Sequence, residues 1–78
     1  ETLWAVRSNQ MHKLLTDLRV IKGVKSAFAF GEEHHATVDV SVLTIENLNQ
    51  SLSQLGHKEI CIERVTLSIE DWFMNLQN

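Results

Sequence analysis

Few residues of this sequence have types and spacings that could support chemistry. His34 and His35 are adjacent, and successive side chains of a strand point to opposite faces, so their imidazoles cannot bind one metal ion without distortion. His12 and His57 are expected near helix ends or in loops, and neither a His-x-x-x-His nor a Cys-x-x-Cys spacing occurs. We therefore predict solvated surface histidines and no metal site.

The other reactive groups also favour structural interpretations. Cys61 lies in an apolar run and is predicted to be a small core residue, not a nucleophile. Glu32 and Glu33 would act as an acid–base pair only in a cleft with a partner, so a solvated hairpin tip is the favoured interpretation. The three glycines are expected at element ends and not in a phosphate-binding loop. We expect no catalytic residue and no cofactor in this chain, neither ATP nor zinc.

Nucleic-acid binding is disfavoured by the charge. Phe28 and Phe30 on a strand could stack on RNA bases, but the formal net charge is −3 and a nucleic-acid interface normally shows an excess of Lys and Arg. Core packing is the favoured role for both rings.

Apolar periodicity predicts six elements that would position these residues. We expect strands over residues 2–7, 24–30 and 35–42, a last strand opening at residues 60–62 with a bulge or strand end near 63–64, one helix starting at Ser8 or Asn9 and stopped by Gly23, and a second from Thr44 to Gly56.

The order βαββαβ predicts a ferredoxin-like α+β fold. Both helices should cover one face of a four-stranded antiparallel sheet, with the first and third strands in the middle. The other face would carry Trp4 and Val6 with the polar residues of the third strand, or Leu3 and Ala5 in the alternative register. Either way the first strand leaves an apolar strip that needs cover, and Trp4 and Val6 are its candidate contact residues.

A short amphipathic helix is predicted at the end of the chain. Its candidate motif and contact residues are Ser68 as N-cap, Glu70 and Asp71 in the first turn, and the apolar Ile69, Trp72 and Phe73. Two aromatic residues so near the end imply docking, either as a lid on the domain's own sheet or on a partner.

The terminal segment resembles the Ser-Leu-Glu-Asp-hydrophobic-Phe signature that ends the ATP-binding subunits of many ABC-type exporters, after a small C-terminal accessory domain. Residues 21–27 followed by Phe30 and Gly31 are similar to the family's leucine-proline-glycine-valine and phenylalanine-glycine run, and Leu55 with Gly56 extends the resemblance over most of the chain.

Three positions depart from the family pattern. Lys22 stands where the family often has proline, as does Leu67 before the signature, and Trp72 replaces the usual aliphatic residue.

The resemblance implies a non-catalytic regulatory or assembly domain of an ABC transporter ATP-binding subunit that drives export. ATP and magnesium would then bind only in an upstream domain absent from this chain. The implied partners are that upstream ATP-binding domain, the membrane permease subunit and a possible second copy in a homodimer. The implied location is cytoplasmic, peripheral to the cell membrane, without direct membrane insertion. The alternative is a free-standing small-molecule-sensing ferredoxin-like domain of the amino-acid-binding regulatory type.

Size and composition agree with one small domain over residues 1–78. The chain is 44% hydrophobic and 22% charged, as in ordinary globular domains. A single cysteine cannot form an internal disulfide and favours a reducing compartment, and no apolar run is long enough for a membrane-spanning helix. Because the sequence begins with Glu1 and not Met, we interpret it as a piece of a longer protein.

Overall fold

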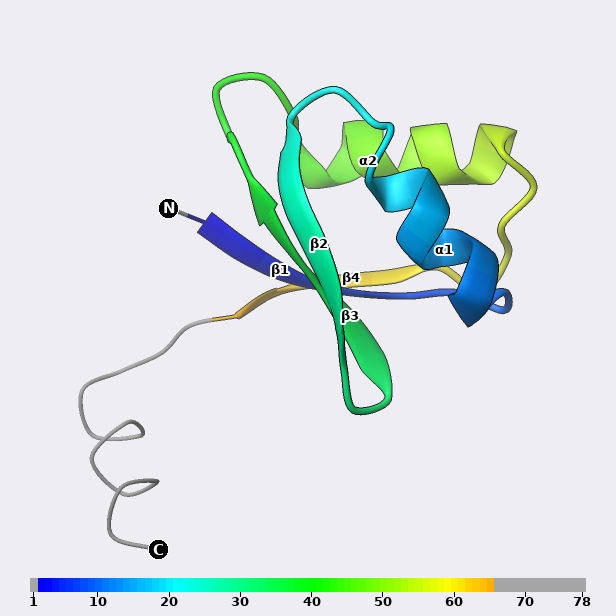
Figure 1. The fold of residues 1–78 in the computed structure, drawn as a ribbon. Helices are drawn as coiled ribbons and strands as arrows, with labels where there is room; N and C mark the ends of the chain where they lie inside the picture. Colours follow the sequence, from blue (N-terminus) through cyan, green and yellow to red (C-terminus); the bar gives the residue numbers. More distant parts are fainter. Residues whose placement is uncertain (1, 66–78) are drawn as a thin grey trace, which may run out of the picture.

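Residues 2–65 are described by a computed structural model, in which two helices cover one face of a four-stranded antiparallel sheet (Figure 1). The elements are β1 (Thr2–Arg7), α1 (Met11–Leu18), β2 (Val24–Phe30), β3 (Glu33–Val38), α2 (Ile45–Gln54) and β4 (Cys61–Val65). The strand order β2-β3-β1-β4 places β1 and β3 in the middle, so the predicted ferredoxin-like arrangement is confirmed. The helix predicted from Ser68 onward lies outside the described residues.

The face of β1 that turns toward the helices is the one that carries Trp4 and Val6. These side chains are 1% and 0% exposed, and β1 pairs with β3 through Leu3 opposite Thr37 and Trp4 opposite Ala36. The alternative register is therefore the observed one, with Leu3 and Ala5 beside Thr37 on the open face. The prediction that Trp4 and Val6 form an uncovered strip is wrong, because the two helices bury this face.

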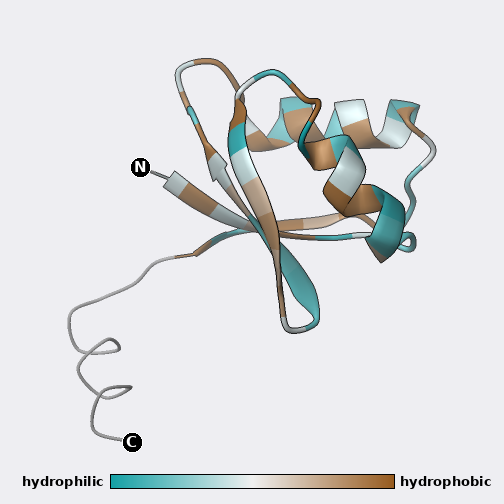
Figure 2. Cartoon of the chain, in the orientation of Figure 1, coloured by the Kyte–Doolittle hydropathy of each residue, from teal (hydrophilic) through white to brown (hydrophobic). Residues whose placement is uncertain are grey.

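The core lies between this sheet face and the helices. Figure 2 shows apolar and polar residues alternating around both helices, and each helix buries two leucines. The buried apolar cluster consists of Trp4, Val6, Leu14, Leu18, Ala27, Ala36, Val38, Leu43, Leu48 and Leu52.

A register shift in β2 changes which residues face the helices. Val24 pairs with Val38 but Ser26 pairs with the next residue along, Thr37, so one extra residue is inserted as a β-bulge. Val24 packs against the core, yet beyond the bulge it is Ala27 that is buried. Phe28 and Phe30 are therefore 44% and 60% exposed, and their predicted core packing is wrong.

Strand β3 ends earlier than predicted because Asp39 turns the chain. Its Oδ1 accepts hydrogen bonds from the Ser41 backbone nitrogen at 3.0 Å and from Ser41 Oγ at 2.6 Å. Its carbonyl accepts from the nitrogens of Val42 and Leu43, both at 3.0 Å. These bonds replace the strand ladder, so Val40 and Val42 lie in a loop, 53% and 46% exposed, and only the first half of the predicted alternation belongs to a strand.

Helix α1 also stops earlier than predicted, with Arg19 as its C-cap. Turn hydrogen bonds follow, from Val20 to the Asp17 carbonyl and from Ile21 to the Leu18 carbonyl. Ile21 still packs against the core, which explains why its spacing matched a helical stripe.

Strand β4 pairs with β1 continuously from Cys61 opposite Arg7 to Val65 opposite Leu3. Of the bulge or strand end predicted near residues 63–64, neither lies at these residues, because β4 pairs continuously through Val65. Ile60 and Ile62 pack against the core, whereas Cys61 is exposed, so the prediction of a buried cysteine is wrong.

Candidate functional site

Three of the four histidines are buried, which contradicts the predicted solvated histidines. His34, His35 and His57 are 8%, 7% and 2% exposed, and only His12 is exposed. Each buried ring has at least one hydrogen-bond partner, although His34 Nδ1 is buried without a partner among the described residues. His34 donates from Nε2 to the Met11 carbonyl at 2.6 Å, which joins β3 to the first turn of α1.

An aromatic surface, formed by Phe28, Phe30 and His35, lies on the open face of the β2–β3 hairpin. The His35 ring stacks on Phe30 with a centroid distance of 4.5 Å and an interplanar angle of 20°, and it meets Phe28 edge-on at 5.8 Å. His35 Nε2 donates to Glu33 Oε2 at 2.7 Å, so the imidazole is held in place between the rings. The result is an aromatic surface in which Phe28 and Phe30 are exposed and the His35 ring is buried beside them.

Ser8, His57 and Asp17 form a hydrogen-bonded chain. Ser8 Oγ lies 2.8 Å from His57 Nδ1, and His57 Nε2 donates to Asp17 Oδ2 at 2.7 Å. Hydrolytic triads have the same order of groups: a nucleophile, a base and a carboxylate that orients the base. The Ser8 hydroxyl, however, also accepts a hydrogen bond from the Gln10 backbone nitrogen at 3.1 Å, which makes it part of a turn.

The surrounding contacts show that the hydrogen-bonded residues Ser8, His57 and Asp17 have a structural role, and we call them and their neighbours the clamp. Most of these contacts join the β1–α1 connection and α1 to the segment that leads from α2 to β4. Asn9 exchanges two hydrogen bonds with Lys58, at 2.9 and 2.8 Å. Lys13 Nζ bonds both Asp17 Oδ2 at 2.8 Å and the Leu55 carbonyl at 2.7 Å. The clamp thus fixes both connections at one end of the sheet.

We predict that the clamp makes the free energy of unfolding depend on pH, and that Asp17→Asn removes this dependence. The hydrogen bond from Lys13, followed by the one from His57, lowers the pKa of the Asp17 carboxyl below its ordinary 3.8. Ionised Asp17 therefore stabilises the fold above pH 3.8, and this stabilisation is lost as the pH falls through the lowered pKa. Because Asp17 lies at the solvent boundary, we expect the variant to lose about 1 kcal/mol of unfolding free energy at neutral pH.

Denaturant unfolding of both proteins between about pH 7 and pH 2 checks this expectation. The stability difference should shrink at the acid end. A difference that stays constant over the range would show that the charge of Asp17 contributes nothing.

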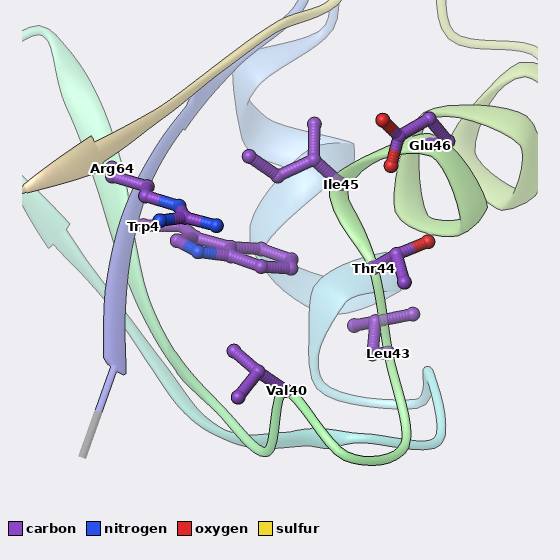
Figure 3. Close-up of a pocket in the computed structure, with 7 residues that line it drawn as sticks. All are labelled: Trp4, Val40, Leu43, Thr44, Ile45, Glu46 and Arg64. Atoms are coloured by element: carbon purple, nitrogen blue, oxygen red, sulfur yellow. The ribbon is translucent and has the colours of Figure 1, made fainter.

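A pocket of about 220 Å³ lies between the sheet and the start of α2 (Figure 3). Trp4 of β1 and Arg64 of β4 are opposite each other on adjacent strands and form one side. The remaining lining residues come from the β3–α2 connection and the first turn of α2: Val40, Leu43, Thr44, Ile45 and Glu46.

The local sequence explains why α2 begins at this pocket. Thr44 has an extended backbone, and its side chain accepts a hydrogen bond from the Asn47 nitrogen at 3.1 Å, so the predicted N-cap is confirmed. Glu46 places a carboxylate in the first turn, where the helix dipole favours negative charge. The first turn of α2 therefore borders the pocket and contributes the carboxylate of Glu46 to it.

Trp4 brings an unsatisfied hydrogen-bond donor to the pocket. Its Nε1 is buried and has no hydrogen-bond partner among the described residues. Such a group costs about 1 to 3 kcal/mol when it stays unpaired. Figure 3 shows the Arg64 guanidinium beside the Trp4 ring and Glu46 across the pocket from it, and no salt bridge between Arg64 and Glu46 is found in residues 2–65.

Of the contact residues predicted from the sequence, the structure describes only Trp4 and Val6. Trp4 and Val6 lie in the core, so neither can form the predicted contact on the open face, although Trp4 reaches the pocket. The predicted contacts of Ser68, Ile69, Glu70, Asp71, Trp72 and Phe73 lie outside the described residues. The sequence analysis missed two features that depend on strand register. These are the exposure of Phe28 and Phe30 and the pairing of Arg64 with Trp4.

Comparisons with known proteins do not assign this chain to a family: no family model matches it, and neither curated proteins nor solved structures gave a match. In residues 2–65, no group of three or more His, Cys, Asp or Glu side chains is arranged to hold a metal ion. Within the same residues no helix is long and apolar enough to cross a membrane.

Proposed function

We propose that this chain is a non-catalytic accessory domain of an ABC-type exporter ATP-binding subunit, and that it regulates or assembles the ATPase through protein contacts on the cytoplasmic side of the membrane. The observation that carries the contact role is the aromatic surface on the open sheet face. Phe28 and Phe30 are large, exposed and adjacent to each other across His35. Exposed apolar surface of this kind favours burial against another protein.

The positions of the motif residues support the resemblance on physical grounds. Gly23 and Gly31 have φ values of +101° and +62°, where glycine is favoured over other residues. The first lies in the α1–β2 connection and the second in the β2–β3 turn. Gly56 follows α2 with φ +96°. The glycines that carry the resemblance are therefore residues that this chain needs at those turns.

The proposed contact partners are the upstream ATP-binding domain, the permease subunit or a second copy of the domain. A contact that differs between the open and closed arrangements of paired ATPase domains would bias them, and such coupling is typically worth about 1 to 3 kcal/mol. That range corresponds to changes in rate of several-fold or more.

Deleting residues 1–78 from the full-length transporter tests this proposal. We expect the ATPase or transport rate to change several-fold while ATP binding is retained. Unchanged activity together with unchanged assembly would refute the proposal. Loss of ATP binding would also contradict it, since the domain would then be part of the nucleotide-binding structure.

A point variant tests whether the aromatic surface is the contact. Phe28→Ser combined with Phe30→Ser should reproduce the effect of the deletion. Val20→Ser is the matched control, because Val20 is 74% exposed and lies outside the sheet, in the turn after α1. Equal effects of the two changes would reject the aromatic surface as the contact.

A second candidate function is small-molecule sensing by a ferredoxin-like regulatory domain. The observation that favours it is the pocket between Trp4, Arg64 and the start of α2, which combines an unpaired donor with charged and apolar lining residues.

A further inference from the structure

The open face of the sheet carries more carboxylates than cations. Residues that pair directly on neighbouring strands share one face, and Ala5 pairs with both His35 and Glu63. Glu63 therefore lies on the same face as the aromatic surface. Alternation along β1 and β3 adds Arg7 and Glu33 to this face. The regular pairs of the described residues thus place two carboxylates and one cation on it.

The β2–β3 turn extends the negative charge around the aromatic surface. Glu32 is exposed in this turn, directly before Glu33, and the turn follows Phe30. Figure 2 shows the hydrophilic start of β3 beside the hydrophobic end of β2. Lys25, the extra residue of the β2 bulge, lies at the other end of that strand and interacts electrostatically with Asp39. The surroundings of Phe30 are therefore acidic.

Apolar side chains lie between these carboxylates. Phe28 and Phe30 are exposed on β2, and Leu3 of β1 pairs with half-buried Val65 of β4. Neighbouring strands lie about 4.8 Å apart, so the face is about 15 Å wide. One α-helix with its side chains is about 10 to 12 Å in diameter. The face therefore has room for a single helix, on an apolar centre with carboxylates at the hairpin end and on β4.

We propose that the aromatic surface binds a basic amphipathic helix of a partner protein. The apolar stripe of that helix packs on Phe28, Phe30 and Leu3. Its flanking Lys and Arg side chains pair with Glu33 and Glu63 and lie over the phenylalanine rings, where cation–π attraction adds to the contact. The inference rests on the proposed contact role of this surface and adds the chemistry of the partner to it.

Charge disfavours the other occupants of this face. A second copy would bring its own excess of carboxylates against the same groups, and like charges at an interface repel each other. Glu70 and Asp71 are the only charged residues after Val65 in the sequence, so the chain's own terminal segment has the wrong sign. Nucleic acids and anionic lipids would bring phosphate groups against the same carboxylates.

Titration of the nitrogen-labelled chain with two matched peptides tests the proposal. Both have about 14 residues, enough for a helix that forms on binding, with leucine on one stripe and either lysine or glutamate at the other positions. We expect the lysine peptide to shift the backbone amide signals of Phe28 and Phe30 in two-dimensional heteronuclear NMR spectra, with a dissociation constant below about 100 μM. The glutamate peptide should bind about ten-fold more weakly or worse, and high salt should reduce this difference.

Variants of the chain separate the apolar contacts from the charged ones. Phe28→Ser combined with Phe30→Ser should abolish binding of the lysine peptide, followed at the His35 amide signal, although the net charge is unchanged. Glu63→Gln should weaken binding about three-fold or more. Glu46→Gln removes the same charge from α2, on the opposite side of the sheet, and should leave the affinity unchanged.

Three results would refute the proposal. Equal affinity for the lysine and glutamate peptides would show that the carboxylates do not select the partner. Equal effects of Glu63→Gln and Glu46→Gln would reduce the preference to net charge. Self-association of the free chain that the two Phe→Ser changes abolish would assign the surface to a second copy. The deletion experiment on the transporter involves neither peptide, so the accessory-domain proposal and this inference can fail separately.

Discussion

Trp4→Ala should lower the free energy of unfolding by about 4 kcal/mol, because it removes the largest side chain of the core. Trp4 is 1% exposed and lies on a central strand, where it packs within the apolar cluster between sheet and helices. The surrounding leucines cannot collapse into the whole volume of an indole, so a cavity would remain. The cost is large against a total stability of about 5 to 10 kcal/mol for a small domain.

Chemical denaturation followed by far-ultraviolet circular dichroism measures this effect. Trp4→Phe retains part of the volume and should cost about 1 to 2 kcal/mol, which keeps the series measurable if the alanine variant unfolds. Phe30→Ala is the control, since Phe30 is 60% exposed and should lose less than about 1 kcal/mol. Equal losses for Trp4→Ala and Phe30→Ala would contradict the buried position of Trp4.

Element order and helix faces could be predicted from this sequence because their signals are local. Thr44 caps α2 as expected, and Leu48 and Leu52 form its buried stripe. Alternation likewise predicted the buried positions Ala36 and Val38 on β3. Periodicity of this kind depends only on near neighbours along the chain.

The predictions were wrong where pairing with a neighbouring strand decides which face of the sheet a residue occupies. A bulge between Val24 and Ser26 reverses the two faces of β2, and strict alternation assigned Phe28 and Phe30 to the wrong face. A bulge is set by cross-strand pairing, which a single strand does not encode. Asp39 followed by Ser41 is different, since Asp with a nearby Ser is a known turn signal and could have been used to end β3.

The candidate pocket could not be predicted from local sequence patterns for the same reason. Its charged and polar groups come from Trp4, Glu46 and Arg64, which lie far apart in the sequence and meet only through the β1–β4 register and the placement of α2. The buried histidines have a similar origin: His57 is hydrogen-bonded to Ser8 and Asp17 across two connections. Polar residues of this type look like surface residues until their partners are known.

Gly23→Ala should destabilise the domain by about 3 kcal/mol, because both the backbone conformation and the available space require glycine. The φ angle of Gly23 is +101°, and a Cβ atom added there would lie 2.6 Å from Leu43 Cβ. Leu43 is 4% exposed and part of the core, and the Gly23 carbonyl accepts a hydrogen bond from the Asp39 nitrogen at 2.8 Å. The α1–β2 and β3–α2 connections are thus in direct contact, and neither can move aside without disturbing the packing of Leu43.

Gly56→Ala separates the two contributions to this cost. Gly56 has a similar φ of +96°, but an added Cβ would have no neighbour within 4 Å, so this variant should show only the conformational strain of about 1 to 2 kcal/mol. The excess loss in Gly23→Ala, measured by chemical denaturation of both variants, is then the steric cost of the contact with Leu43. If the two variants lose the same stability, the close approach of the two connections does not contribute, and Gly23 is needed only for its backbone angle.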